Sequence, residues 1–173
     1  MLPIGAYAMN PERGSPASIL LQKLSAEKLE SLLRENADES NPTLAPALAG
    51  RTFSTTLGLA RAVRAALPLH KEEERELSVR RVFQALRIAV NDEFSALETF
   101  LRNLPACLNP GGRVAILTFH SGEDRRVKKS FEAGLREGYY AAIATEVVRP
   151  TAEERGSNPR ASSAKLRWAR RRL

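Results

Sequence analysis

The chain has 173 residues, enough for one domain or for a domain with a small appendage. No apolar run approaches the ~20 residues that cross a bilayer, and one cysteine excludes an intrachain disulfide framework and agrees with a reducing, cytoplasmic location. The net charge of +7, most of it from arginine, favours a nucleic-acid partner, although a basic solvated surface would have the same composition.

The first part of the chain predicts helices and no strand. Residues 1–14 lack periodicity and indicate a loop, and Ser15-Pro16 is a good helix start, with serine as N-cap and proline in the first turn. Ser25 caps a second predicted helix, and Thr55-Thr56 opens another that runs to about residue 67. We therefore expect a helical subdomain over residues 1–77 and a second domain over residues 78–173.

One long helix is predicted from Ser78 to Leu104, because its apolar residues recur at steps of three and four. A second stripe on this helix is polar. Its members are Arg80, Gln84, Arg87 and Asn91. The stripe is either the wet face of the helix or a strip that faces a ligand or RNA.

The segment 114–117 is a continuous apolar run that follows a Pro-Gly-Gly turn. Such a run predicts a strand buried on both faces, as in a parallel α/β sheet. Because ligands bind at the carboxyl ends of strands in open α/β sheets, the polar residues 118–125 are the candidate site.

Within this segment Ser121 and Asp124 have the spacing of a capping box, which predicts a helix over about residues 123–136. Glu123 in its first turn complements the helix dipole. His120 either faces the crevice or is a satisfied structural histidine. No catalytic triad follows from adjacency in sequence, and with two histidines and one cysteine we expect no metal site.

The remainder of the chain predicts two strands and a short helix. The segment 141–148 is a strand candidate, Thr151 begins a helix that Asn158-Pro159 ends, and alternation around Leu166 and Trp168 suggests a final edge strand with Trp168 in the core. Six basic residues and no acidic one follow Asn158. Together with the neighbouring hydroxyl groups, these basic residues either bind a phosphate backbone or form a basic solvated tail.

Three blocks of this sequence resemble the bacterial small-subunit rRNA methyltransferase family known as RsmH or MraW. The first block is the segment 81–93 with Phe83-Gln84-Ala85-Leu86-Arg87-Ile88, the second is Leu108 to Lys128 with Phe119-His120-Ser121 and Glu123-Asp124-Arg125, and the third is Asn158 to Arg167. The helical opening resembles the helical domain inserted in this family, in shortened form.

The resemblance implies the C-terminal part of a Rossmann-like α/β methyltransferase sheet with a small all-helical subdomain. It implies methyl transfer from S-adenosylmethionine to the exocyclic amine of a cytosine in small-subunit rRNA. The implied pocket for the target base contains His120, Ser121, Glu123 and Asp124. The candidate RNA-binding residues are Arg80, Arg87, Asn91, Arg125, Asn158, Arg160, Ser163, Lys165 and Arg167.

The chain also departs from the family's pattern. The family's glycine-rich loop, acidic ribose-binding residue and aspartate-bearing strand belong to an N-terminal half, and none of them occurs here, so we assign no cofactor-binding residue. Position 122 is glycine where the family has leucine. We expect a chain that is inactive alone and that associates with a missing N-terminal half or with a second copy, because the missing strands would leave a sheet edge open. The alternative is a non-catalytic remnant that binds rRNA or a partner.

Overall fold

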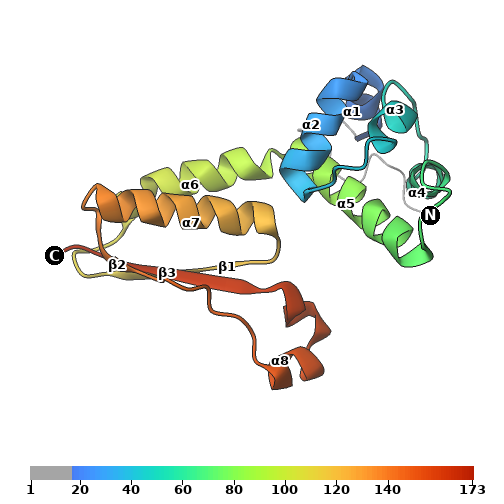
Figure 1. Cartoon of the computed structure of the whole chain (residues 1–173). Coiled ribbons are helices and arrows are strands. Elements are labelled where there is room, and N and C mark those ends of the chain that lie inside the picture. The colour runs from blue at the N-terminus through green and yellow to red at the C-terminus, as the bar shows by residue number, and fades with distance from the viewer. Residues whose placement is uncertain (1–16) are drawn as a thin grey trace. The chain divides into compact units, whose positions relative to one another are not determined.

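The computed structural model describes residues 17–173, and the predicted helix start at Ser15-Pro16 lies outside the described residues. The chain divides into two compact units, a helical unit up to Glu93 and a sheet unit from Phe94 onward (Figure 1). No helix in the described part combines the length and the apolar character needed to cross a membrane.

The helical unit contains five described helices that enclose one apolar core. They are α1 (Ala17–Lys23), α2 (Ala26–Ala37), α3 (Leu44–Leu48), α4 (Thr56–Ala65) and α5 (Glu72–Asn91). The predicted caps are confirmed: the hydroxyl of Ser25 accepts from the Lys28 amide at 3.4 Å, and that of Thr55 accepts from the Gly58 amide at 3.1 Å. Each cap satisfies an amide that the first helical turn leaves without an intrahelical partner.

Helix α5 contributes to the core of the helical unit. Val82, Ala85 and Leu86 are buried against apolar residues of α2 and α4, and Asn36 of α2 donates to the carbonyl of Ala85 at 3.1 Å. The sequence indicated a division at residue 77, before most of this helix. In the structure the whole of α5 packs with the helical unit.

The single helix predicted from Ser78 to Leu104 is wrong. Helix α5 ends at Asn91, and α6 (Glu93–Cys107) begins two residues later. The break lies at Asp92, whose φ of 50° places it in the left-handed region, while its amide donates to the carbonyl of Ile88. Because aspartate adopts this conformation more readily than most residues, it can end a helix without disturbing the apolar periodicity on either side.

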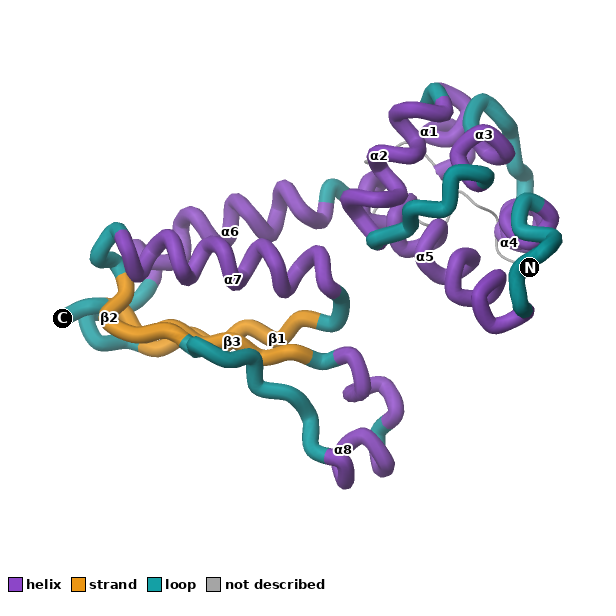
Figure 2. The backbone as a smooth tube through the Cα atoms, in the orientation of Figure 1, coloured by secondary structure: helices purple, strands orange, loops and turns teal. Residues whose placement is uncertain are grey.

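The sheet unit is an α/β arrangement with its two longest helices on one face of a three-stranded sheet (Figures 1 and 2). Its further elements are β1 (Arg113–Thr118), α7 (Ser121–Arg136), β2 (Tyr140–Ile143), α8 (Ala152–Ser157), the 3₁₀ helix η2 (Pro159–Ser163) and β3 (Lys165–Arg171). Leu101 and Leu104 of α6 join Val127 and Phe131 of α7 in the core above the sheet.

The strand order is β1-β3-β2, and β3 is antiparallel to both neighbours. This corrects two predictions: β1 has no parallel neighbour among the described residues, and the last strand is central instead of at the edge. The strand expected over 141–148 is also shorter, since β2 ends at Ile143 and only Val148 forms a further isolated bridge, to Leu166.

The register sends alternate residues of β3 to opposite faces. Arg167 and Ala169 lie opposite Ile116 and Val114 and are buried beneath the helices. Trp168 lies opposite Ala115 on the other face and remains 38% exposed. The core position predicted for Trp168 is therefore wrong, as is burial of the first strand on both faces.

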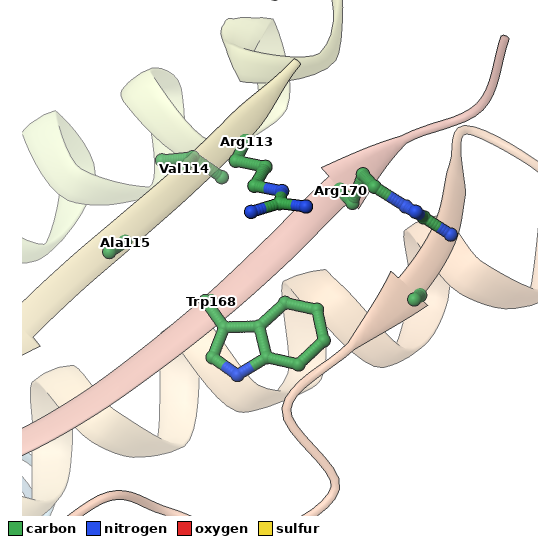
Figure 3. A pocket seen from close by; sticks show the side chains of 6 residues that line it. Arg113, Val114, Ala115, Trp168 and Arg170 are labelled. Atoms are coloured by element: carbon green, nitrogen blue, oxygen red, sulfur yellow. The ribbon is translucent and has the colours of Figure 1, made fainter. Parts of the chain in front are cut away.

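We call this second surface the bare face, defined by Arg113, Ala115, Leu117, Ala142, Trp168 and Arg170. Figure 3 shows the Trp168 indole on β3, with the side chains of Arg113 and Arg170 on the same surface. The apolar residues around Trp168 line a shallow hollow of about 670 Å³. An apolar sheet surface of this kind is normally covered by another layer of the fold.

We predict that Gly134→Ala destabilises the sheet unit although it adds a better helix former. A Cβ at position 134 would lie 2.6 Å from two ring atoms of buried Tyr140, and such overpacking costs about 1–3 kcal/mol, more than the helix gain of about 1 kcal/mol. Urea denaturation of Gly134→Ala should show a free energy of unfolding about 1 kcal/mol lower than that of the native chain. The matched control is Gly156→Ala in α8, where no atom lies within 4 Å of the added Cβ. Equal stabilities of both variants would contradict the prediction.

Candidate active site

The candidate site begins at the N-terminus of α7, directly after β1. Its N-cap is His120 and not Ser121, which is the first helical residue. The His120 Nδ1 accepts from the Glu123 amide at 3.4 Å, while the Glu123 carboxylate accepts from the Phe119 amide at 3.0 Å. The reciprocal cap therefore lies one residue earlier than the spacing of Ser121 and Asp124 predicted.

This cap orients the imidazole. Nδ1 accepts from the Glu123 amide, and Nε2 is then directed toward the Glu123 carboxylate. Nε2 is buried and lies 3.3 Å from Oε1 of Glu123, so the imidazole and this carboxylate face each other at the site.

Burial would raise the pKa of the Glu123 carboxyl, but the hydrogen bonds from His120 and from the amide of Phe119 outweigh it and lower that pKa overall. Glu123 is thus a carboxylate at neutral pH. Its side chain is 30% exposed, so it retains capacity to accept a further hydrogen bond.

Asp124 joins α7 to the central strand. Its two carboxylate oxygens accept from Arg167 at 2.7 and 3.3 Å, and Lys165 Nζ lies 3.8 Å away. Burial alone would raise the pKa of Asp124, but the paired Arg167 and the charges of Lys165 and Arg149 lower it. Three cations thus act on one carboxylate, which leaves an excess of positive charge beside the helix start.

Other predicted residues lie in the segment that leads into β3. The Asn158 side chain accepts from the Arg160 amide at 3.2 Å and so begins η2, and both Arg160 and Ser163 are exposed. Arg125 is exposed on α7, one residue beyond Asp124. These residues belong to the same unit as His120 and Asp124.

Arg80, Arg87 and Asn91 belong to the helical unit and not to this cluster. Arg87 forms a two-pronged ion pair with Glu93, at 2.9 and 3.0 Å, to which Asn91 also donates. Arg80 donates to the carbonyl of Glu76 at 3.4 Å. Their contact with RNA remains a prediction, and for Arg87 such a contact would compete with Glu93.

Three neighbours of the site were not selected from the sequence. Phe94 lies beside His120, Arg126 stacks on the Phe94 ring, and Arg149 acts on Asp124. Phe94 belongs to an apolar stripe that predicts core, and nothing in the sequence places α6 against the start of α7. The described residues contain no group of histidine, cysteine and acidic side chains that could hold a metal ion.

Comparisons with known proteins show the family to which the chain belongs. Residues 7–172 match the model of the MraW methylase family, and the chain belongs to that family. It is 48% identical to "Ribosomal RNA small subunit methyltransferase H 2" of Alkaliphilus metalliredigens over 171 residues, which are 93% of this chain and 49% of the relative. The "Ribosomal RNA small subunit methyltransferase H 1" of Lachnoclostridium phytofermentans is 44% identical over 93% of this chain and 47% of its own length. The chain spans about half the length of these curated relatives.

We predict that Asp124→Asn weakens folding in a pH-dependent way. Removing one partner of a largely buried ion pair costs about 3 kcal/mol at neutral pH. Because the folded state lowers the pKa of Asp124, this stabilisation is complete above the ordinary value of 3.8 and is lost as the pH falls below it. Denaturant titrations should therefore show a lower free energy of unfolding for the variant than for the native chain at pH 7. This difference should become smaller toward pH 3.

The matched control for this prediction is Glu132→Gln. Glu132 pairs with Lys128 at 3.8 Å, and both side chains are about half exposed. An exposed pair contributes little, so this variant should stay within about 0.5 kcal/mol of the native chain. If Asp124→Asn lowers the free energy of unfolding by no more than Glu132→Gln does, the pair of Asp124 and Arg167 is not a stabilising contact.

Proposed function

We propose that this chain supplies the acceptor side of an S-adenosylmethionine-dependent methyltransferase that acts on the exocyclic amine of a cytosine in small-subunit rRNA. The observation that carries the proposal is the meeting of residues far apart in sequence. Asp124, in the first turn of α7 beside His120 and Glu123, forms a bidentate pair with Arg167 of β3, 43 residues further along the chain. Lys165 of the same strand lies 3.8 Å from the Asp124 carboxylate. These residues come from two of the blocks that resemble the family.

The two carboxylates of the site suit different tasks. Arg167 occupies both oxygens of Asp124, whose side chain is 14% exposed, so this residue holds the site together. Glu123 is more accessible and ionised. Carboxylates accept from the N4 amino group of cytosine, so Glu123 is the better candidate to hold the target amine, with the His120 imidazole beside it.

The described residues do not fit the methyl donor. The only Gly-Gly pair in the described segment, Gly111-Gly112, precedes β1, and its amides are already engaged: Gly111 donates to Arg172 at 3.4 Å and Gly112 to Asn109 at 2.8 Å. A Cβ at Gly112 would lie 2.7 Å from the Asn109 carbonyl oxygen, so this is a closed turn and not an open cradle. Methyl transfer requires donor and acceptor held in line, and this chain provides groups for the acceptor.

We propose further that the bare face and the free edge of β1 are where the donor-holding polypeptide docks. In the described chain β1 pairs with β3 alone, so its outer edge can accept another strand. The apolar surface around Trp168 could be covered by a helix, and the charges of Arg113 and Arg170 favour acidic residues at its rim. The curated relatives contain about as much further polypeptide as they share with this chain.

The test combines this chain with the polypeptide of the Alkaliphilus relative that lies outside the match, prepared without tryptophan. Trp168 is the only tryptophan here, so docking on the bare face should shift its fluorescence to shorter wavelength. The mixture should then bind S-adenosylmethionine by calorimetry and methylate small-subunit rRNA. The isolated chain should do neither, and micromolar binding of the donor by the isolated chain would contradict the proposal.

His120→Ala is the control within this experiment. It should dock and shift Trp168 fluorescence like the native chain but lose most methyl transfer, because it removes a polar group beside the target base without touching the bare face. Unchanged transfer would exclude His120 from the site. A fluorescence shift that depends on the concentration of this chain alone would identify a second copy as the occupant.

The surplus of positive charge supports a second candidate function, which is rRNA binding without turnover. Cations that neutralise phosphates give an affinity that falls steeply with salt. We predict that Arg160→Gln weakens binding to small-subunit rRNA and reduces the slope of log affinity against log salt by about 1. The matched control is Arg61→Gln, an exposed arginine of α4 outside the predicted set. Equal slopes for both variants would remove Arg160 from the interface.

A further inference from the structure

Phe94 lies where the start of α6 meets the start of α7, and it is only 8% exposed. Its ring centroid is 5.8 Å from that of the His120 imidazole, with a tilt of 50° between the planes. The guanidinium carbon of Arg126 lies 3.4 Å from the centroid of the same phenyl ring. The ring thus contacts a site residue and a cation at once.

Arg126 is itself held in place. Its Nε donates to Glu98 at 2.8 Å, and its Nη1 donates to the carbonyl of Gly122 at 3.2 Å. Glu98 is on α6 and Gly122 is on α7, so Arg126 ties the two helices together around the phenyl ring. A guanidinium stacked on an aromatic face adds a favourable electrostatic contact.

Gly122 makes the space that the ring occupies. A Cβ at this position would lie 2.6 Å from Cζ of Phe94 and 3.3 Å from Nδ1 of His120. A side chain at 122 and the Phe94 ring in its present place therefore exclude each other.

We propose that Phe94, paired with Gly122 and held by Arg126, is a positioning residue for His120. The phenyl ring supports one side of the imidazole, while the Glu123 amide holds Nδ1. Together these contacts fix the ring orientation that leaves Nε2 next to the Glu123 carboxylate. The relevance to methyl transfer rests on the proposed function, but the positioning itself is a property of the free chain and is testable without activity.

The experiment is ¹H–¹³C NMR of the imidazoles in the native chain and in Phe94→Leu, which keeps an apolar side chain but removes the ring. The chain has only two histidines, so His70 of the helical unit is an internal reference. We expect contacts by nuclear Overhauser effect between Phe94 and His120 in the native chain. In the variant we expect displaced or broadened His120 signals with unchanged His70 signals.

The matched control is Phe131→Leu. Phe131 is a buried phenylalanine of the same unit that packs on Tyr140. It should lower the melting temperature as Phe94→Leu does while leaving the His120 signals in place. The proposal is overturned if both variants displace the His120 signals alike, because the effect is then a general loosening of the unit. It is also overturned if neither variant displaces them, because the Phe94 ring then does not support the imidazole.

A second measurement tests the pairing of residues 94 and 122 through thermal stability instead of through the His120 signals. Gly122→Ala should lower the melting temperature in the native background but much less in the Phe94→Leu background, because the added methyl group then has room. Additive effects would refute the pairing of residues 94 and 122. If the pairing holds and His120→Ala still supports full methyl transfer in the reconstituted enzyme, the positioning role stands and the proposed function of His120 fails.

Discussion

The register of β3 between β1 and β2 is the constraint on which the sheet unit depends. In a strand, neighbouring side chains point to opposite faces, and a shift of one residue would exchange the two sets. The present register places Arg167 beneath α7, where it binds Asp124, and places Trp168 on the bare face. The candidate site and the proposed docking surface are therefore two results of the same strand pairing.

The ion pair of Asp124 and Arg167 is a local consequence of this register. The two side chains are only 10–14% exposed, so burying either charge alone would carry a large desolvation cost. Their pairing offsets this cost and fixes the orientation of Arg167 toward Asp124. Once Arg167 is fixed, Lys165 lies two residues earlier on the same face, and its charge also reaches Asp124. The cap made by His120 and Glu123 then adds a second, more accessible carboxylate in the adjoining turn, and the proposed role of Glu123 at the target amine depends on this difference in accessibility.

The local features of the fold were predictable from the sequence. The caps at Ser25 and Thr55 follow from a hydroxyl before an apolar-periodic segment, and the cap at Thr151 follows from the Thr-x-x-acid spacing with Glu154. Each is present. The α/β class and the family were also predictable, the family through blocks whose order and spacing are specific. What failed were features set by distant partners. The sequence of 114–117 does not encode the direction of its neighbour, and apolar periodicity continues through Asp92 although the helix does not.

The site shows the same limit. His120, Glu123, Asp124, Lys165 and Arg167 were selected by motif, and the structure brings them together. Phe94 and Arg126 carry no such signal, because a phenylalanine in an apolar stripe looks like any other core residue. Only the meeting of α6 with α7 gives it a neighbour of chemical interest. The glycine at 122 was visible as a departure from the family's pattern, but the close approach of the Phe94 ring to it was not.

The position of β3 in the chain has a consequence for the order of folding. The described helices of the first unit all end before Asp92, so that unit can form while later residues are still being synthesised. In contrast, β1 must wait some fifty residues for its partner, since its hydrogen bonds all go to β3. During translation the nascent strand β1 and then β2 are unpaired, and this interval is when a chaperone or a complementary polypeptide would find them most accessible.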